Sequence, residues 1–277
     1  MTLPAPTVPE VRKYWQENPL HGFELTNLGS AAFFEKVDRL KREDIETFAL
    51  DFWEFSRYRG KQILDVGFGP GWFTVQYALA GGIVEAVDLT PIAVELTQRH
   101  LEARGASAHV QEGNAECLPF ADHLFDLVVA AGVFHHTPDT EKAFSECFRV
   151  LKPGAKAKIS LYHKGILHHP LLFPFVKILM KLVKVKHPGA DLAKTARSVD
   201  DFIRQYDGQQ NPVGIGKTKK EWVRLLQKAG FKVEKSELHY FPKRFIPFQK
   251  LIPRAVHRLF DRFFGTMIYF HLAKPPS

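Results

Sequence analysis

Three glycines spaced two residues apart, Gly67, Gly69 and Gly71, follow an apolar run in the stretch "ILDVGFGPGW" (63–72). The run before them is typical of a buried strand, and the residues after them are typical of a helix. In a parallel α/β sheet, ligands bind beyond the carboxyl ends of the strands, where glycines allow positive φ and close approach to the backbone. The stretch therefore predicts a ligand-binding loop at the end of a buried strand, with an ordinary tight turn as the alternative.

Strands separated by helices continue along the chain after this loop. The predicted strands are 62–67, 83–90, 107–113, 125–134 and 155–163. The predicted helices between them are 72–82, 91–105 and 140–154. Helices of this length between strands imply parallel pairing with right-handed crossovers. The sequence thus predicts an α/β fold with a doubly wound sheet.

The chain divides into four parts around this core. We expect a helical N-terminal cap at 1–60, the core at 61–162, a helical and loop insertion at 163–217, and the end of the core sheet at 218–277. The detailed expectations outside the core are helices at 43–60 and 217–231, strands at 232–241 and 266–274, and a basic-aromatic helical segment at 243–264.

Composition narrows the class of protein. A chain of 277 residues with 45% hydrophobic and 25% charged residues can form one packed domain with appendages. The two cysteines, Cys117 and Cys147, are too few for a disulfide framework, and the histidine pairs 135–136 and 168–169 lack helix-face metal spacing. The first ten residues do not resemble a secretion signal, and we find no apolar run long enough to span a bilayer. We therefore expect a cytoplasmic protein without a metal, at most peripheral to a membrane.

The net charge of +8 conceals an asymmetry between the two halves of the chain. Residues 1–149 carry 13 Lys and Arg against 22 Asp and Glu, whereas residues 150–277 carry 25 against 8. A basic half of this kind indicates an anionic partner, such as a phosphate-bearing substrate, a membrane surface or a nucleic acid. An accumulation of surface lysines without a partner is the alternative.

The spacing in the glycine loop distinguishes between cofactors. A dinucleotide loop requires G-x-G-x-x-G or a small residue at its last position, where this chain has Trp72. Asp65, two residues before Gly67, can hold a ligand ammonium group, and Asp88 at the end of the second strand can accept hydrogen bonds from ribose hydroxyls. An ammonium and a ribose without a pyrophosphate fit S-adenosylmethionine better than NAD.

Several motifs support this choice by resemblance. In order they are "ILDVGFGPG", "VEAVDLT", "GNAECLPF", "FDLVVAAGVFHHTPD" and "AFSECFRVLKPGAKAKIS", within residues 60–162. Together they resemble the class I S-adenosylmethionine-dependent methyltransferases, in particular the small-molecule group that includes ubiquinone/menaquinone-biosynthesis C-methyltransferases. The resemblance implies a Rossmann-like, seven-stranded sheet whose last strand is antiparallel, with "TMIYFHLAK" as that strand.

The resemblance also implies a set of cofactor-binding residues. They are Tyr14, Asp65, Gly67, Phe68, Gly69, Gly71, Asp88, Leu89, Asn114, Ala115 and Ala131. Asn114 stands where the family usually has Asp, but an amide oxygen can still accept a hydrogen bond from the adenine amino group. Tyr14 would close over the cofactor from the N-terminal cap, with aromatic packing as the alternative.

Methyl transfer, as the resemblance implies it, is an in-line displacement at the methyl carbon of the sulfonium. If the acceptor must lose a proton, His135 and His136, directly after the fourth strand, are the candidate bases. Tyr162 and His163, at the end of the fifth strand, are candidates for the acceptor pocket. Packing or loop hydrogen bonding by the histidines is the alternative role.

Two segments outside the core combine apolar and basic residues. In "FPFVKILMKLVKVK" (173–186), Lys177, Lys181 and Lys184 form one basic stripe, and residues 243–264 interleave Phe and Leu with Lys and Arg. Helices of this kind suit a lid over the acceptor pocket, which we favour, or an anionic membrane interface. The segments can serve both as a lid and as a membrane interface if the acceptor is a lipid or quinone-like molecule.

The sequence thus favours a methyltransferase acting on a small, apolar or lipid-like acceptor. The alternatives are an RNA (tRNA) methyltransferase and a non-catalytic S-adenosylmethionine-binding protein. A nucleic acid is the less favoured partner because so much Phe and Leu in the basic segments suits apolar burial better than a phosphate track.

Overall fold

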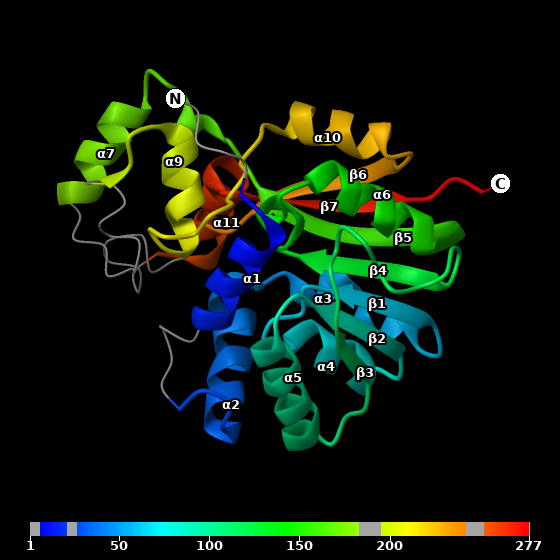
Figure 1. Ribbon diagram of the computed structural model, residues 1–277. Helices are drawn as coiled ribbons and strands as arrows, with labels where there is room; N and C mark the ends of the chain where they lie inside the picture. Colours follow the sequence, from blue (N-terminus) through cyan, green and yellow to red (C-terminus); the bar gives the residue numbers. More distant parts are fainter. Residues whose placement is uncertain (1–5, 21–26, 183–194, 242–251, 277) are drawn as a thin grey trace.

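The computed structural model describes residues 6–20, 27–182, 195–241 and 252–276 (Figure 1). The predicted position Lys184 and the first part of the basic-aromatic segment, 243–251, lie outside the described residues.

A seven-stranded sheet forms the centre of the molecule, in the order β3-β2-β1-β4-β5-β7-β6. The strands are β1 (Gln62–Val66), β2 (Ile83–Asp88), β3 (His109–Glu112), β4 (Phe125–Ala131), β5 (Leu151–Tyr162), β6 (Lys232–His239) and β7 (Met267–Ala273). The pairs among β1 to β5 are parallel, and β7 runs antiparallel to both β5 and β6. The predicted α/β sheet with an antiparallel last strand is confirmed.

Helices cover both faces of this sheet because its central strands are apolar on both sides. The helices next to the sheet are α3 (Ala49–Trp53), α4 (Trp72–Leu79), α5 (Pro91–Arg104), α6 (Thr140–Val150) and α10 (Lys219–Lys228). Val128 and Ala130 of β4 pack in a cluster with residues of α6 and α10, whereas Leu127 and Val129 pack with residues of α3 and α4. Figure 1 shows α6 and α10 on one side of the sheet and α3 to α5 on the other.

The predicted helix at 43–60 is wrong in detail. The cap contains α1 (Val8–Glu17), α2 (Ala31–Leu40), a π-helical turn (Lys41–Ile45), α3 and a 3₁₀ turn (Phe55–Tyr58). Between α3 and the 3₁₀ turn, Glu54 adopts a left-handed conformation with φ 49°. Its carboxylate lies 2.8 Å from Nζ of Lys158. Lys158 on β5 is 1% exposed and the Glu54 side chain is 28% exposed, and this ion pair competes with continuation of the helix.

The predicted helix at 140–154 also ends early. Helix α6 stops at Val150 and β5 begins at Leu151. Pro153 cannot donate a helical hydrogen bond and disfavours helical geometry at the residue before it.

The helical insertion after the fifth strand is confirmed. Its described elements are a 3₁₀ turn (Ile166–His168), α7 (Phe173–Leu182), α9 (Val199–Arg204) and a 3₁₀ turn (Gln205–Asp207). Helix α11 (Arg254–Phe264) follows β6 and packs against it and against the turn Ile166–His168. In Figure 1 these helices gather, with α1, beyond the ends of β4 and β5.

We predict that Gly71→Ala destabilises the fold more than Gly105→Ala does. Both glycines have positive φ, 75° and 61°, so alanine strains both by about 1 kcal/mol. A Cβ at Gly71 would lie 2.5 Å from the side chain of Thr97 on α5, whereas one at Gly105 would meet nothing within 4 Å. Urea unfolding should therefore give a loss of about 3 kcal/mol or more for Gly71→Ala. Equal losses would show that the loop does not depend on close packing against α5.

Candidate active site

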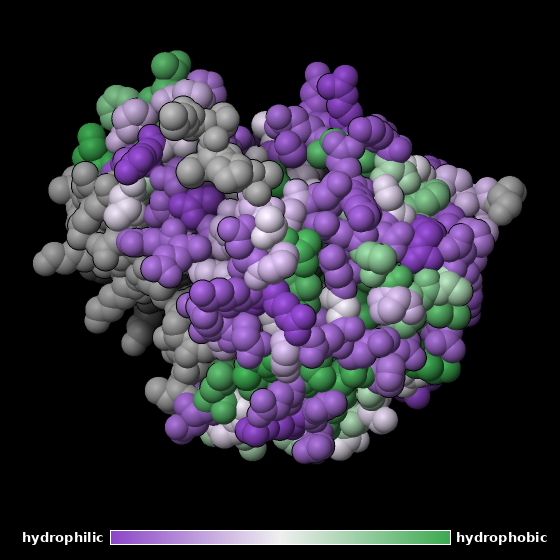
Figure 2. Space-filling model, in the orientation of Figure 1, coloured by the Kyte–Doolittle hydropathy of each residue, from purple (hydrophilic) through white to green (hydrophobic). Residues whose placement is uncertain are grey.

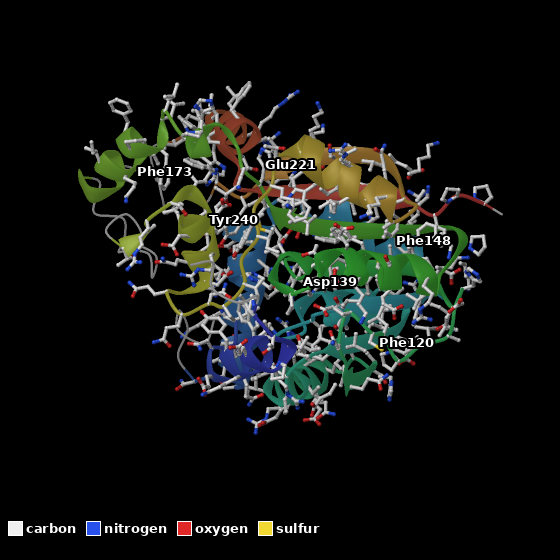
Figure 3. The ribbon with its side chains drawn as sticks, turned by 45° about the horizontal axis from the view of Figure 1, so that its top comes forward. Phe120, Asp139, Phe148, Phe173, Glu221 and Tyr240 are labelled. Carbon is white, nitrogen blue, oxygen red and sulfur yellow. The ribbon has the colours of Figure 1, made fainter. Side chains whose placement is uncertain are left out.

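A cavity of about 660 Å³ lies beyond the carboxyl ends of β1, β2, β4 and β5. Its walls come from these strand ends and, on the other side, from α1, the π-helical turn, α9 and α11. Tyr240, labelled in Figure 3 between the insertion helices and the sheet, also lines it. This position is the ligand site expected of an open α/β sheet.

The glycine loop gives this cavity a backbone floor. Gly67 and Gly69 line the cavity with φ of 69° and 54°, whereas Gly71 does not line it. A Cβ on Gly69 would have no neighbour nearer than 3.9 Å, so this residue leaves open space for a ligand. A Cβ on Gly67 would lie 2.5 Å from Val133, so Gly67 is required for close approach of the loop after β4. Phe68, buried against Ala86 and Ala93, anchors the loop from behind.

Asp88 is held rigidly at the edge of the cavity. Its Oδ2 accepts from the backbone N–H of Gly69 at 3.0 Å, and its Oδ1 accepts from the backbone N–H and the hydroxyl of Thr90, both at 3.0 Å. Burial raises the pKa of the Asp88 carboxyl, which these hydrogen bonds oppose. A carboxylate offers about four lone-pair positions, so accepting capacity remains for a ligand hydroxyl.

The remaining predicted cofactor residues that line the cavity are Leu89, Asn114, Ala115 and Ala131. The side-chain oxygen of Asn114 accepts from the backbone N–H of Glu116 at 2.9 Å. This bond orients the amide and leaves its second lone pair and its NH₂ group for a ligand.

Asp65 does not line the cavity. It is 1% exposed, and the Thr74 hydroxyl donates to its Oδ2 at 2.6 Å. Burial, with the nearby Asp88 adding to it, raises the pKa of Asp65 to about 7. The carboxyl thus lies behind the loop, and its contact with a ligand ammonium stays a prediction.

His136 and Tyr162 meet at Asp207, which comes from the insertion. His136 Nδ1 lies 2.6 Å from the carbonyl oxygen of Val213, and its Nε2 lies 3.1 Å from Oδ2 of Asp207. A carbonyl oxygen can only accept, so Nδ1 carries a proton. The Tyr162 hydroxyl donates to the same carboxylate oxygen. Burial and Asp207 raise the pKa of Tyr162 well above its usual value, so the hydroxyl stays protonated.

His135 differs from its neighbour. It lines the cavity, is 1% exposed, and its Nδ1 has no hydrogen-bond partner among the described residues. Burial, followed by the adjacent His136, lowers the pKa of His135 well below its usual value. The ring is therefore neutral at neutral pH.

The other two predicted aromatic residues lie outside the cavity lining. His163 is buried, and burial lowers its pKa. The Tyr14 hydroxyl donates to the backbone carbonyl of Asp207, and burial raises the pKa of Tyr14 to about 12. Tyr14 therefore joins α1 to the insertion, next to Trp15, which does line the cavity.

The acidic and basic residues of the cavity wall that the sequence analysis missed include Lys41, Glu46, Glu116 and Asp207. Among the described residues, Lys41 is the one Lys or Arg that lines the cavity. Its Nζ lies 3.7 Å from Oε1 of Glu46, whose Oε2 accepts from the indole N–H of Trp53 at 3.0 Å. The π-helical turn that brings this pair to the cavity has no local sequence signal that we recognise.

Comparisons with known proteins agree with this geometry. Residues 64–159 match the family model described as a methyltransferase domain. The chain is 33% identical over 166 residues to malonyl-[acyl-carrier protein] O-methyltransferase of Erwinia billingiae, covering 57% of this chain and 62% of that protein. It is 29% identical over 167 residues to ubiquinone/menaquinone biosynthesis C-methyltransferase UbiE of Yersinia pestis, covering 57% and 64%.

The matched regions are shorter than the proteins themselves. The chain spans 35% of an uncharacterized Mycobacterium tuberculosis protein, Rv1405c, at 38% identity, and less than two thirds of the two methyltransferases. Among solved structures, the [4+2]-cyclase SpnF has a TM-score of 0.63 at 17% identity, covering 99% of this chain and 98% of that one. A putative methyltransferase from Bacillus halodurans has a TM-score of 0.54 at 20% identity, covering 83% and 99%.

These structures share the fold, and the family match covers the strands and loops that form the cavity floor. Residues 64–159 thus match a methyltransferase domain, and over this core the chain is similar to S-adenosylmethionine-dependent methyltransferases. The predicted resemblance is confirmed for this core.

We predict that Asp65→Asn changes the pH dependence of stability. The pKa of Asp65 is about 7 in the folded protein against 3.8 ordinarily, so between these values the folded state holds a proton that the unfolded state lacks. The contribution of Asp65 to stability is therefore present below pH ~4 and is lost as pH rises to ~7. The unfolding free energy of the original protein should fall, relative to that of the Asn variant, by up to about 4 kcal/mol over this window. Denaturant unfolding at several pH values measures this difference, and parallel pH profiles would contradict it.

Proposed function

We propose that this protein transfers a methyl group from S-adenosylmethionine to a small, largely apolar acceptor bound in the same cavity. One observation carries the proposal: a single cavity joins the glycine loop and Asp88 to an apolar chamber formed by the insertion and α11. The chamber residues include Val176, Phe202, Tyr206, Phe260 and Phe264.

The residues at the loop end fit the cofactor's groups. Gly69 leaves space for the ligand, Asp88 can accept from ribose hydroxyls, and Asn114 can bind the adenine edge. Lys41 supplies the positive charge that an α-carboxylate requires. When bound, S-adenosylmethionine supplies an electrophilic methyl carbon on a sulfonium.

The chain's part in such a reaction is mainly alignment and exclusion of water. Holding two reactants in line can contribute about 7–11 kcal/mol to lowering the barrier. The apolar chamber walls keep water from the reacting atoms, and the fixed Asp207 carboxylate, bonded by His136 and Tyr162, can orient a polar group of the acceptor.

A base role falls to His135 rather than His136. Both ring nitrogens of His136 already have neighbours, the carbonyl oxygen of Val213 and the carboxylate of Asp207. His135 is neutral, lines the cavity and has a ring nitrogen without a partner among the described residues. It would accept the acceptor's proton, or a hydrogen bond where no proton is lost.

A quinone-like or lipid-like acceptor suits the apolar chamber better than RNA does. A nucleotide substrate would require several cations near its phosphates, whereas Lys41 is the one Lys or Arg in the described lining. The relative named for ubiquinone/menaquinone biosynthesis supports the quinone-like class.

A role other than methyl transfer has one observation in its favour. The [4+2]-cyclase SpnF aligns with this chain over nearly the full length of both proteins. The fold is therefore compatible with other chemistry, and binding of the cofactor alone would not establish turnover.

We expect calorimetry to show that the protein binds S-adenosylmethionine and S-adenosylhomocysteine. Asp88→Ala should lower the affinity for both compounds by about 10- to 100-fold, because charge-assisted hydrogen bonds are lost. Asp122→Ala, at a carboxylate outside the cavity lining, is the control and should bind normally. Methyl-labelled cofactor incubated with a lipid and quinone extract should then give a labelled product. Absence of binding heat from either compound, or binding of NADH instead, would refute the assignment.

We also expect His135→Phe, which keeps a ring and removes the nitrogens, to lower kcat/KM by about 10²- to 10⁴-fold. Cofactor affinity should stay unchanged, which shows that the cavity is intact. The control is His169→Phe, because His169 is exposed and does not line the cavity. If the His135 variant turns over at the full rate, His135 is not the base: either another residue takes the proton or the reaction needs no base.

A further inference from the structure

Large apolar side chains are exposed on the outer side of α7 and α11. On and next to α7, Leu171 is 75% exposed and Phe175 70%, and on α11 Phe263 is 62% exposed and Leu259 57%. Figure 2 shows strongly hydrophobic atoms at the tip of the molecule where α7 lies in Figure 1. Side chains of this size rarely gather on the surface without a partner.

Both helices pack against the same turn, Ile166–His168, which brings their exposed side chains to one region of the molecule. Ile166 itself is 56% exposed between them. We call this surface the apolar-basic face. Its residues are Ile166, Leu171, Leu172, Phe175, Ile178, Val256, Leu259 and Phe263, together with the exposed Arg258 and Arg262.

The other side of the same elements lines the acceptor chamber. On α11, Val256, Leu259 and Phe263 are exposed, whereas Phe260 and Phe264 line the cavity. Likewise, Ile178 of α7 is exposed and Val176 lines the cavity. A thin wall of two helices therefore separates the chamber from the apolar-basic face.

The charge of this region matches an anionic surface. Arg258 and Arg262 alternate with the exposed apolar residues of α11, which is the pattern of a helix that lies in a membrane interface. Residues 163–182 contain lysines and no Asp or Glu, and the whole stretch 150–277 has 25 Lys and Arg against 8 Asp and Glu. Among the described residues, no helix is long and apolar enough to cross a membrane.

We propose that the apolar-basic face docks on the surface of a bilayer containing anionic lipids, and that the chamber receives its acceptor from that bilayer. The second clause rests on the proposed function, whereas the docking does not. In this arrangement the apolar side chains enter the acyl boundary and the two arginines lie at the lipid phosphates.

Vesicle flotation tests the docking. The full chain should float with phosphatidylcholine vesicles that contain phosphatidylglycerol and should bind pure phosphatidylcholine vesicles at least tenfold more weakly. The triple variant Phe175→Ser, Leu259→Ser, Phe263→Ser should lose at least tenfold in binding to the anionic vesicles. A matched variant, Leu50→Ser, Leu79→Ser, Ile83→Ser, changes residues that are 69%, 52% and 52% exposed elsewhere and should bind normally.

A second variant separates charge from apolar contact and guards against misfolding. Arg258→Gln with Arg262→Gln should remove most of the preference for phosphatidylglycerol while leaving the melting temperature unchanged. Failure of the full chain to bind anionic vesicles, or an equal loss in both triple variants, would overturn the proposal. So would a dimer in size-exclusion chromatography that the first triple variant abolishes, because the face would then be covered by a second copy.

The outcomes distinguish this proposal from the proposed function. Calorimetric binding of S-adenosylhomocysteine should be unchanged in the triple variant if the methyltransferase assignment is right. Vesicle binding without any cofactor binding would support the docking and refute the function.

Discussion

The backbone of Gly69 is fixed from two sides, and the cavity floor depends on this constraint. Its N–H donates to Asp88 at the end of β2, while its carbonyl accepts from the Thr97 hydroxyl of α5 at 3.0 Å. Thr90, which caps α5, donates to the same Asp88. The loop after β1, the end of β2 and the start of α5 thus form one hydrogen-bonded unit. A side chain at Gly69 would fill the space that this unit leaves open for a ligand.

A second unit closes the opposite side of the cavity. The carboxylate of Asp207 binds His136 from the loop after β4 and Tyr162 from the end of β5, and its backbone carbonyl accepts from Tyr14 of α1. Cap, core and insertion therefore meet at one residue. The Asp207 side chain is 21% exposed and lines the cavity, which suits a group that orients an acceptor. The buried pair of Lys41 and Glu46 adds a polar site to a lining that is otherwise largely apolar.

The sheet and the cofactor side of the cavity were predictable from the sequence because they depend on local signals. Apolar runs separated by helices indicate parallel strands. The positive φ angles of Gly67 and Gly69 were predictable because glycine adopts such angles without steric cost. What the sequence did not show depends on how different parts of the chain pack together. Glu54 breaks a helix because of Lys158, 104 residues away, and His136 is engaged by Asp207, 71 residues away. The orientation of Asp65 behind the loop, toward Thr74, is also an outcome of packing, and the contact of Asp65 with a ligand ammonium stays a prediction.

The central claim is that cofactor and acceptor share one cavity, with the cofactor's sulfur facing the chamber. A crystal structure of the complex with S-adenosylhomocysteine tests this most directly. We expect the ribose to lie at Asp88, the adenine beside Asn114, and the sulfur to be open to the space near His135 and Tyr162. A nucleoside bound outside this cavity, or a sulfur walled off from the apolar chamber, would contradict it.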